Sequence, residues 1–533
     1  MREAPQNRAR PRRAGYILGA AALICAGLWI SLHYCLVAWK ADPDIFVSVA
    51  LWRGAQDHGL GFLKTWTYTE DNWLFSLLPV SSLIYSVFGA TARVAALVGW
   101  LFFVASVGLT GWLTARMAGW RAGLATAVVL LFANYHALGH VGFLGYPITH
   151  NVSLAWGLVV LLLAYWGLER RLYGPCLAAG VMLYLDAVSD PWASAAIAAP
   201  LILTSGALAV LNRGTRLGGC ARALCLVAAL ALWAAYKHPF GLLQFLRRGH
   251  FQPGGWDALV TNLSLGYRAL SVMFNIAPGA NLDEPRTKIV SLAALAVMVG
   301  GAAVLTLLGW RRASPGRQLT GAVSILSIGA VTALYLLGPP NTGMYVARFF
   351  PNLYFLGALL IATVAAERWR AWPWALKGLV AIYAALFMAS AAAMAPQDWT
   401  SPIPSSEPAQ ARALGELLEA HHLTYGYGPY WGANALAMDT LTGGAVTVRP
   451  VVFQNGRVAR RPVETSSLWY APGAEPAGAS PFLVIRSDIE GCPATDACEA
   501  AARAQFGAPA ERLTQGDAVV LVWRRPMAPL LDR

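Results

Sequence analysis

Runs of about 20 apolar residues recur along the first three quarters of the chain. A bilayer core about 30 Å thick is crossed by about 20 apolar residues in a helix, so each run predicts a membrane span. Only 13% of the residues are charged, about half the share that is usual in soluble domains. The sequence therefore predicts an all-α polytopic membrane domain with eleven spans, at residues 15–37, 93–115, 122–139, 151–168, 174–188, 192–211, 219–236, 289–309, 319–337, 349–365 and 374–394.

One further apolar segment, residues 73–88, is short and carries Pro79 in its middle. We predict that it forms an interfacial helix outside the membrane. With this assignment, the Arg and Lys clusters fall in five loops on the same side as the basic amino-terminal tail, as the positive-inside rule requires. The prediction is a multi-pass protein of a bacterial-type inner membrane. Its tail (1–14) is cytoplasmic, its membrane domain covers 15–395 and its outer loops cover 38–92 and 237–288.

A mixed domain is expected after the last span. A linker rich in Pro and Ser (396–408) precedes residues 409–533, which the sequence assigns to a periplasmic α/β domain. Helical spacing covers 409–421, and strand patterns cover 423–427, 445–453, 481–486 and 518–523. Cys492 and Cys498 are either a local disulfide, which this location favours, or two free thiols. The net charge of +13 reflects the basic cytoplasmic loops, so it does not indicate a nucleic-acid partner.

Four carboxylates lie in the first outer loop: Asp42 and Asp44 directly after the first span, and Glu70 and Asp71 before the interfacial segment. A carboxylate at the membrane surface can act as a general base on a hydroxyl. The alternative is that Asp42 caps a helix that begins at Pro43, and that Asp71 caps the next helix. We interpret the first pair as catalytic and the second as acidic support.

The order of these features resembles the GT-C glycosyltransferases, in particular the protein O-mannosyltransferase and lipid A aminoarabinose transferase branch. The shared order is a first span, an acidic pair, an amphipathic loop, a short helix that ends at Val87-Phe88-Gly89, and Ala92-Arg93 opening the next span. The resemblance implies inverting transfer of a sugar from a polyprenyl-phosphate donor to an acceptor outside the cytoplasm. Pro43 separates the two acids, unlike the family's usual pair. Asp44 is the favoured match, with Asp42 as the alternative.

Such a reaction needs cations that hold the donor phosphate. Lys237, His238, Arg247 and Arg248 follow the seventh span on an amphipathic stretch, where they either bind phosphate or contact anionic lipid headgroups. Arg348, in Tyr345-Val346-Ala347-Arg348-Phe349, is the candidate that the resemblance favours. Its alternative role is interfacial anchoring.

Other candidates lie at the outer ends of spans. Asp190 is a further acidic candidate, unless it only starts the turn before Pro191. Trp192 and Tyr345 are candidate sugar contacts. His136 and His140 lie one helical turn apart, but no third ligand accompanies them. We therefore interpret them as hydrogen-bonding contacts and assign no residues to a metal site. The sequence identifies no certain cofactor and leaves a divalent cation, Mg²⁺ or Mn²⁺, open.

Two functional classes remain at this stage, a glycosyltransferase and a multispanning transporter or lipid flippase. Transporters usually carry internal repeats and charges near the bilayer midplane, whereas here the acids cluster at the outer surface. The sequence therefore favours a transferase. Its expected partners are the lipid-linked donor, a glycan, lipid or protein acceptor, and membrane lipids.

Overall fold

The computed structural model describes residues 10–38, 42–238, 243–246, 252–276, 285–400 and 406–531. The chain divides into two compact units. The helical unit contains Met1–Ala38, Gly99–Lys237 and His250–Pro402. The α/β unit contains Trp39–Val98, His238–Gly249 and Ile403–Arg533, so it combines the first predicted outer loop with the carboxy-terminal region.

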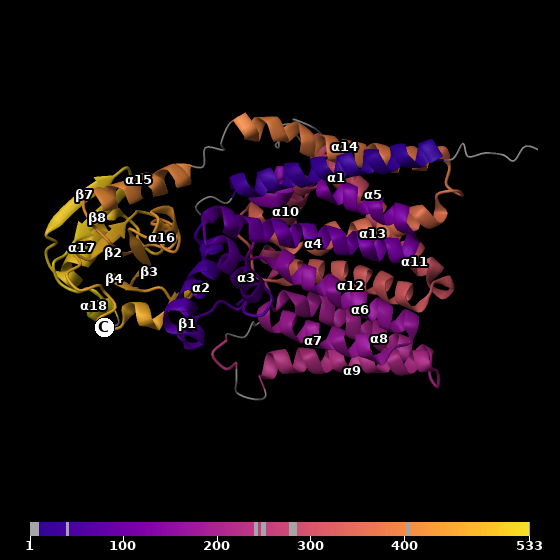
Figure 1. The fold of residues 1–533 in the computed structure, drawn as a ribbon, viewed down its shortest axis with the longest axis horizontal. Helices are drawn as coiled ribbons and strands as arrows, with labels where there is room; N and C mark the ends of the chain where they lie inside the picture. The colour runs from indigo at the N-terminus through magenta and orange to yellow at the C-terminus, as the bar shows by residue number, and fades with distance from the viewer. Residues whose placement is uncertain are drawn as a thin grey trace, which may run out of the picture. The chain divides into compact units, whose positions relative to one another are not determined.

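Long helices lie side by side in the helical unit (Figure 1). They are α1 (Arg10–Ala38), α4 (Ala92–Ala118), α5 (Trp120–Leu131), α6 (His150–Arg170), α7 (Tyr173–Ser189), α8 (Ala199–Leu211), α9 (Arg216–Lys237), α10 (Trp256–Met273), α11 (Pro285–Gly309), α12 (Pro315–Leu337), α13 (Pro351–Arg368) and α14 (Trp374–Thr400). Helix α6 packs against α7 and α12. The close approach of α7 to α9 depends on Gly180, where a Cβ atom would lie 2.8 Å from the Val227 side chain.

Eight helices in the described part of the chain are long and apolar enough to cross a membrane. They expose large apolar side chains such as Leu230 (59%), Val297 (70%) and Ile382 (59%). Apolar surface of this extent is typical of contact with lipid. The prediction of a multi-pass membrane protein with an all-α membrane domain is confirmed, although the number of eleven spans is not. The other three predicted spans are also helical, with 12 residues in α5, 17 in α7 and 18 in α13.

One local prediction in this unit needs correction. The predicted helix 122–139 ends at Leu131, and His136–His140 form a separate π-helical turn, η3. Buried Asn134 interrupts the helix, because its side chain accepts a hydrogen bond from Ala137 N and donates to Met273 O (2.8 and 3.2 Å). The segment 237–288, predicted as a loop, contains α10. Asn262 on α10 is fully buried and donates to Tyr335 O on α12 (3.0 Å).

The amino-terminal part of the α/β unit is built from short elements. They are η1 (Pro43–Phe46), α2 (Val47–His58), η2 (Leu60–Lys64), β1 (Trp66–Thr67) and α3 (Leu78–Phe88). Helix α3 falls within the segment predicted as interfacial. Pro79 lies in its first turn, and Gly89 ends it with a φ of 78°. Its eleven residues span about 16 Å, roughly half of a bilayer core.

The carboxy-terminal part has a mixed six-stranded sheet in the order β4-β3-β2-β6-β8-β7. Strand β2 is parallel to β3 and β6, and the other pairs are antiparallel. The strands are β2 (Tyr425–Gly428), β3 (Thr447–Gln454), β4 (Arg457–Arg460), β6 (Phe482–Ile485), β7 (Glu511–Gln515) and β8 (Ala518–Val522), with helices α15 (Ser406–Ala420), α16 (Met438–Leu441), α17 (Thr495–Phe506) and α18 (Ala528–Leu531). The predicted α/β class is confirmed.

The sheet's hydrophobic core follows from alternation along the strands. Phe482 and Val484 on β6 join the core cluster that contains Leu414 and Leu418 of α15, while α17 packs against β4 and β6. A second, two-stranded sheet pairs β1 with β5 (Thr465–Ser466), with Trp66 opposite Ser466 and Thr67 opposite Thr465. Through this sheet, the segment after the first helix becomes part of the same unit as the carboxy-terminal region.

Candidate active site

Asp42 and Asp44 have different roles in the structure. Asp42 is the N-cap of η1, because its carboxylate accepts a hydrogen bond from the backbone N–H of Asp44 at 2.9 Å, and Pro43 occupies the first helical position. This is the capping geometry that an Asp-Pro sequence favours. Asp44 is half-buried, and its Oδ1 accepts a hydrogen bond from the hydroxyl of Tyr430 at 2.6 Å.

Tyr430 is fully buried in the loop after β2. Burial raises its pKa well above the ordinary value, and the negative charges of Asp44 and Glu464 raise that pKa further. The hydroxyl therefore stays protonated and donates to Asp44. A short hydrogen bond to an ionised acceptor is stronger than a neutral one, so Tyr430 holds the Asp44 carboxylate in one orientation.

Arg461 connects two more carboxylates to Tyr430. Its guanidinium lies 3.8 Å from the centre of the Tyr430 ring. It forms an ion pair with Glu464 and another with Glu490, in which Nε and Oε1 are 3.4 Å apart. We refer to Asp44, Tyr430, Arg461, Glu464 and Glu490 as the Asp44 cluster. All five belong to the α/β unit.

Two members of the Asp44 cluster adopt strained backbone conformations. Glu464 has a φ of 54° and Glu490 a φ of 50°, in the left-handed region that non-glycine residues seldom occupy. The backbone N–H of Glu464 donates to Thr67 O at 2.7 Å, next to the β1–β5 pair. Strained positions of this kind persist where the surrounding structure fixes them, and they concentrate at functional sites.

The pKa of Glu464 is raised to about 7. Burial is the main cause, the charge of Asp44 adds to it, and Arg461 opposes it. The charge of Asp71 also contributes, which relates the second acidic pair of the loop to this cluster. Glu70 is exposed.

The raised pKa makes stability depend on pH. A carboxyl with a pKa near 7 when folded and near 4.5 when unfolded binds its proton more tightly in the folded protein. Its contribution to the free energy of unfolding therefore falls as pH rises from about 4.5 to 7, by on the order of 3 kcal/mol. We expect the melting temperature of the α/β unit to fall less steeply with pH in Glu464→Gln than in the wild type. Thermal unfolding of the purified protein from pH 5 to 8 measures this, and exposed Glu416→Gln is the control. Equal slopes in all three proteins would contradict the assignment.

A second group of predicted residues comes together in the helical unit. Asp190 is 1% exposed and accepts hydrogen bonds from Ser153 Oγ (2.8 Å) and from Trp192 N (2.9 Å). His150 Nδ1 lies 2.8 Å from Asp190 Oδ2. The His150 ring stacks between Trp192 and Phe349, with both pairs of ring centroids 5.3 Å apart.

Arg348 lies beside this group in η6 (Met344–Phe349). Its guanidinium carbon is 5.4 Å from the centre of the Tyr345 ring and 5.3 Å from that of Phe349. Its Nε is buried and has no hydrogen-bond partner among the described residues. The indole N–H of Trp192 donates to Phe349 O at 3.1 Å and ties the two parts together. We refer to this group as the Arg348 cluster; its members are Asp190, His150, Trp192, Phe349 and Arg348.

The remaining predicted contacts are more scattered. Lys237 is exposed at the end of α9, and His238 is buried. Arg247, Arg248 and the His140 side chain lie outside the described part of the structure. His136 is 9% exposed and meets the Tyr135 ring edge-on. Within the described residues, no three His, Cys, Asp or Glu side chains are grouped to hold a metal ion. A disulfide joins Cys492 and Cys498.

Sequence reasoning missed Tyr430, Arg461, Glu464 and Glu490. Tyr430 belongs to an aromatic run, Tyr425 to Trp431, that sequence alone makes look like core packing. No spacing rule relates Asp44 to Tyr430, which lies 386 positions further along the chain. The β1–β5 pairing that joins the two segments involves only two residues on each strand, too few to leave a pattern.

Comparison with known proteins gives a structural match only. No protein-family model matches the chain, and no curated protein sequence matches it. The crystal structure of ArnT from Cupriavidus metallidurans in the apo state superimposes with a TM-score of 0.57 at 13% identity, covering 98% of this chain and 100% of that one. The structure of the same protein bound to undecaprenyl phosphate gives a TM-score of 0.56 at 13% identity, covering 95% of this chain and 98% of that one. The chain therefore shares its fold with ArnT, in agreement with the resemblance found in its sequence.

Proposed function

We propose that the chain is an integral-membrane glycosyltransferase that moves a sugar from a polyprenyl-phosphate donor to an acceptor at the periplasmic face. The observation that carries the proposal is the Asp44 carboxylate, half-buried just after the first membrane helix and oriented by buried Tyr430. The shared fold with ArnT, whose structure was solved with undecaprenyl phosphate, supports a donor of that class. The positive-inside pattern supports a cytoplasmic amino terminus and a periplasmic α/β unit.

The reaction assigns Asp44 the role of general base. The acceptor hydroxyl or amine attacks the anomeric carbon of the donor sugar while Asp44 removes the attacking group's proton. The bond between that carbon and the phosphate oxygen breaks, and its electron pair leaves with the polyprenyl phosphate. Attack from the face opposite the leaving group inverts the anomeric configuration. Tyr430 keeps the carboxylate in place, and Arg461 offsets the negative charge of Glu464 and Glu490.

The leaving phosphate needs a cation, and Arg348 is the residue we assign to it. A guanidinium can bind a phosphate through two hydrogen bonds and offset the charge that develops on it. The rings of Tyr345 and Phe349 hold the Arg348 side chain, and its buried Nε lacks a protein partner in the described part of the chain. We assign Asp190 an indirect role: its carboxylate holds His150 and Trp192, which lie beside Arg348 in the Arg348 cluster.

Arg348→Gln tests the phosphate assignment. A hydrogen bond to a charged group contributes about 1.5–3 kcal/mol, so we expect undecaprenyl phosphate to bind at least tenfold more weakly. Affinity can be measured by titrating the lipid into the purified protein in detergent. The control is Arg317→Gln, because Arg317 forms an exposed ion pair with Glu367 (2.7 Å) and lies outside the Arg348 cluster. Unchanged affinity in Arg348→Gln would contradict the assignment.

A further inference from the structure

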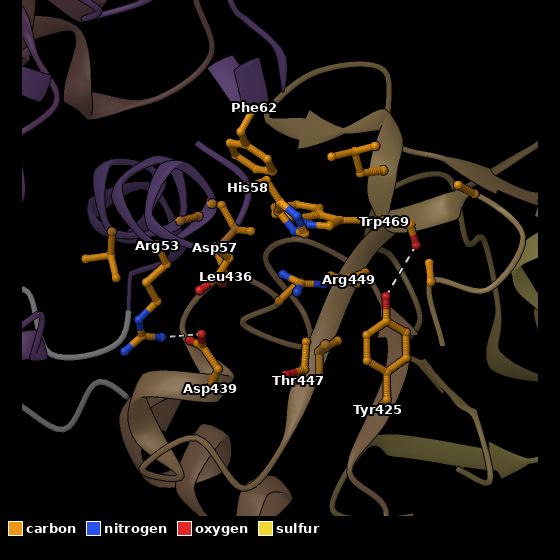
Figure 2. Close-up of a pocket in the computed structure, with 18 of the residues that line it drawn as sticks. Arg53, Asp57, His58, Phe62, Tyr425, Leu436, Asp439, Thr447, Arg449 and Trp469 are labelled. Carbon is orange, nitrogen blue, oxygen red and sulfur yellow. Dashed lines mark hydrogen bonds and ion pairs between the residues drawn. The ribbon is translucent and has the colours of Figure 1, made fainter. Parts of the chain in front are cut away.

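The α/β unit contains a cavity of about 550 Å³ that the residues of the Asp44 cluster do not line. It lies between α2 on one side and strands β2 and β3 on the other, and all its lining residues belong to this unit (Figure 2). Cavities of about 300–1,000 Å³ are typical of sites for small ligands.

The lining combines apolar, aromatic and charged side chains. Arg53 and Asp57 come from α2, and Asp439 comes from α16. Arg53 and Asp439 form an ion pair, so their charges offset each other. The aromatic rings of Trp469 and Tyr425 also line the cavity, and both are largely buried (7% and 6% exposed). Hydroxyl-binding carboxylates next to aromatic rings suit a sugar, which has polar edges and apolar faces.

Arg449 on β3 is the cation in this cavity whose charge no carboxylate offsets within ion-pair distance in the described part of the chain. Its guanidinium carbon lies 4.2 Å from the centre of the Trp469 ring and 5.8 Å from that of Tyr425. Its Nε is buried and lacks a hydrogen-bond partner among the described residues. Figure 2 shows the side chain reaching from the strand into the cavity toward α2.

Stacking prepares Arg449 to bind an anion. A guanidinium held flat against an aromatic ring loses little further freedom when it binds, and its planar donors match a carboxylate or phosphate. A buried donor without a partner is costly until a ligand satisfies it. Opposite Arg449, the exposed side chains of Asp57 and His58 present groups that can accept or donate hydrogen bonds to hydroxyls.

We propose that this cavity binds an anionic saccharide, with the acid group of the sugar on Arg449 and its hydroxyls on Asp57 and His58. We identify this saccharide as the acceptor of the transfer reaction, and this identification rests on the proposed function. Binding itself does not depend on transfer, because Asp44 does not line the cavity. The acid group is a carboxylate, as in a uronic acid, or a phosphate ester, and the two are separated by the choice of probe.

Calorimetric titration of the full-length protein in detergent tests the proposal. The probes are trigalacturonate, glucose 6-phosphate and neutral maltotriose. We expect one of the two acidic probes to bind at least tenfold more tightly than maltotriose, and Arg449→Gln to lose at least tenfold of that affinity. Arg512→Gln is the matched control, since Arg512 pairs with Glu499 (3.0 Å) and does not line the cavity. The proposal is overturned if neither acidic probe binds the wild type, or if Arg449→Gln binds as tightly as the control.

Two additional variants keep the result clear. Arg449→Lys retains the charge but loses the planar arrangement of donors, so we expect its affinity for the acidic probe to lie between those of the wild type and Arg449→Gln. This variant also tests the proposal if Arg449→Gln does not fold. Asp44→Asn should bind the acidic probe like the wild type. If that variant and the wild type both bind the probe but neither transfers sugar, the proposed function fails while the binding site stands. If the protein transfers sugar but binding of the acidic probes does not depend on Arg449, the binding site is refuted while the proposed function stands.

Discussion

Asp44→Asn is expected to lower the rate of sugar transfer by a factor of about 100 to 10,000, the usual contribution of a general base. Asn has nearly the same shape and can still accept the hydrogen bond from Tyr430, so the substitution removes the basic group with little change in packing. The rate can be measured with a radiolabelled polyprenyl-phosphate sugar and the purified protein in liposomes.

Asp42→Asn is the matched control for this result. Asp42 caps η1 through a side-chain oxygen that accepts the Asp44 N–H, and Asn caps helices about as well as Asp. We therefore expect Asp42→Asn to transfer sugar at a rate close to that of the wild type. If Asp42→Asn is inactive and Asp44→Asn is active, the assignment of the base is reversed. If both are fully active, neither residue is the base.

Arg461→Met is expected to have the largest effect on stability. Arg461 is the cation between Glu464 and Glu490, and its side chain is 13% exposed. Removing one partner from a buried ion pair costs about 3–5 kcal/mol, because a carboxylate is left buried without its counter-charge. We expect a marked fall in the melting temperature of the α/β unit at pH 8, where Glu464 is ionised, and a smaller fall at pH 5.

A double substitution separates lost charge from lost packing. Glu464→Gln in the Arg461→Met background removes the unpaired charge, so it should restore much of the stability at pH 8. The control is Arg503→Met, which breaks an exposed pair with Glu499 (2.7 Å). Such pairs contribute about 0–1 kcal/mol. If Arg461→Met were no more destabilising than Arg503→Met, the Asp44 cluster would not be held by Arg461.

The membrane helices were predictable because their apolar runs are continuous. Helix α10 was not, because Asp257, Asn262 and Arg268 interrupt its apolar residues and it packs by its buried face alone. In the α/β unit, strand β8 was predicted because its residues form a continuous apolar run, whereas the more exposed β7 carries no apolar pattern. Continuous apolar runs thus report elements that are surrounded by lipid or buried on both faces, and they miss a helix with one polar face or an exposed edge strand.

The candidate site was predictable only in its local parts. The position of Asp44 after the first span and the capping role open to Asp42 are both contained in a few neighbouring residues. The Tyr430 and Arg461 contacts depend on long-range pairing, which a single sequence does not encode in a recognisable motif. Arg348 was singled out through a family resemblance, and the stacking of His150 between Trp192 and Phe349 was not anticipated.

The most direct test of the central claim is the pool of lipid-linked sugars in cells that depend on this protein. Mass spectrometry of extracted polyprenyl-phosphate lipids should be compared among the wild type, Asp44→Asn and Asp42→Asn, each present at equal amounts in the membrane. The claim predicts that one polyprenyl-phosphate sugar accumulates in Asp44→Asn and stays at the wild-type level in Asp42→Asn. Identical lipid profiles in all three strains would contradict it.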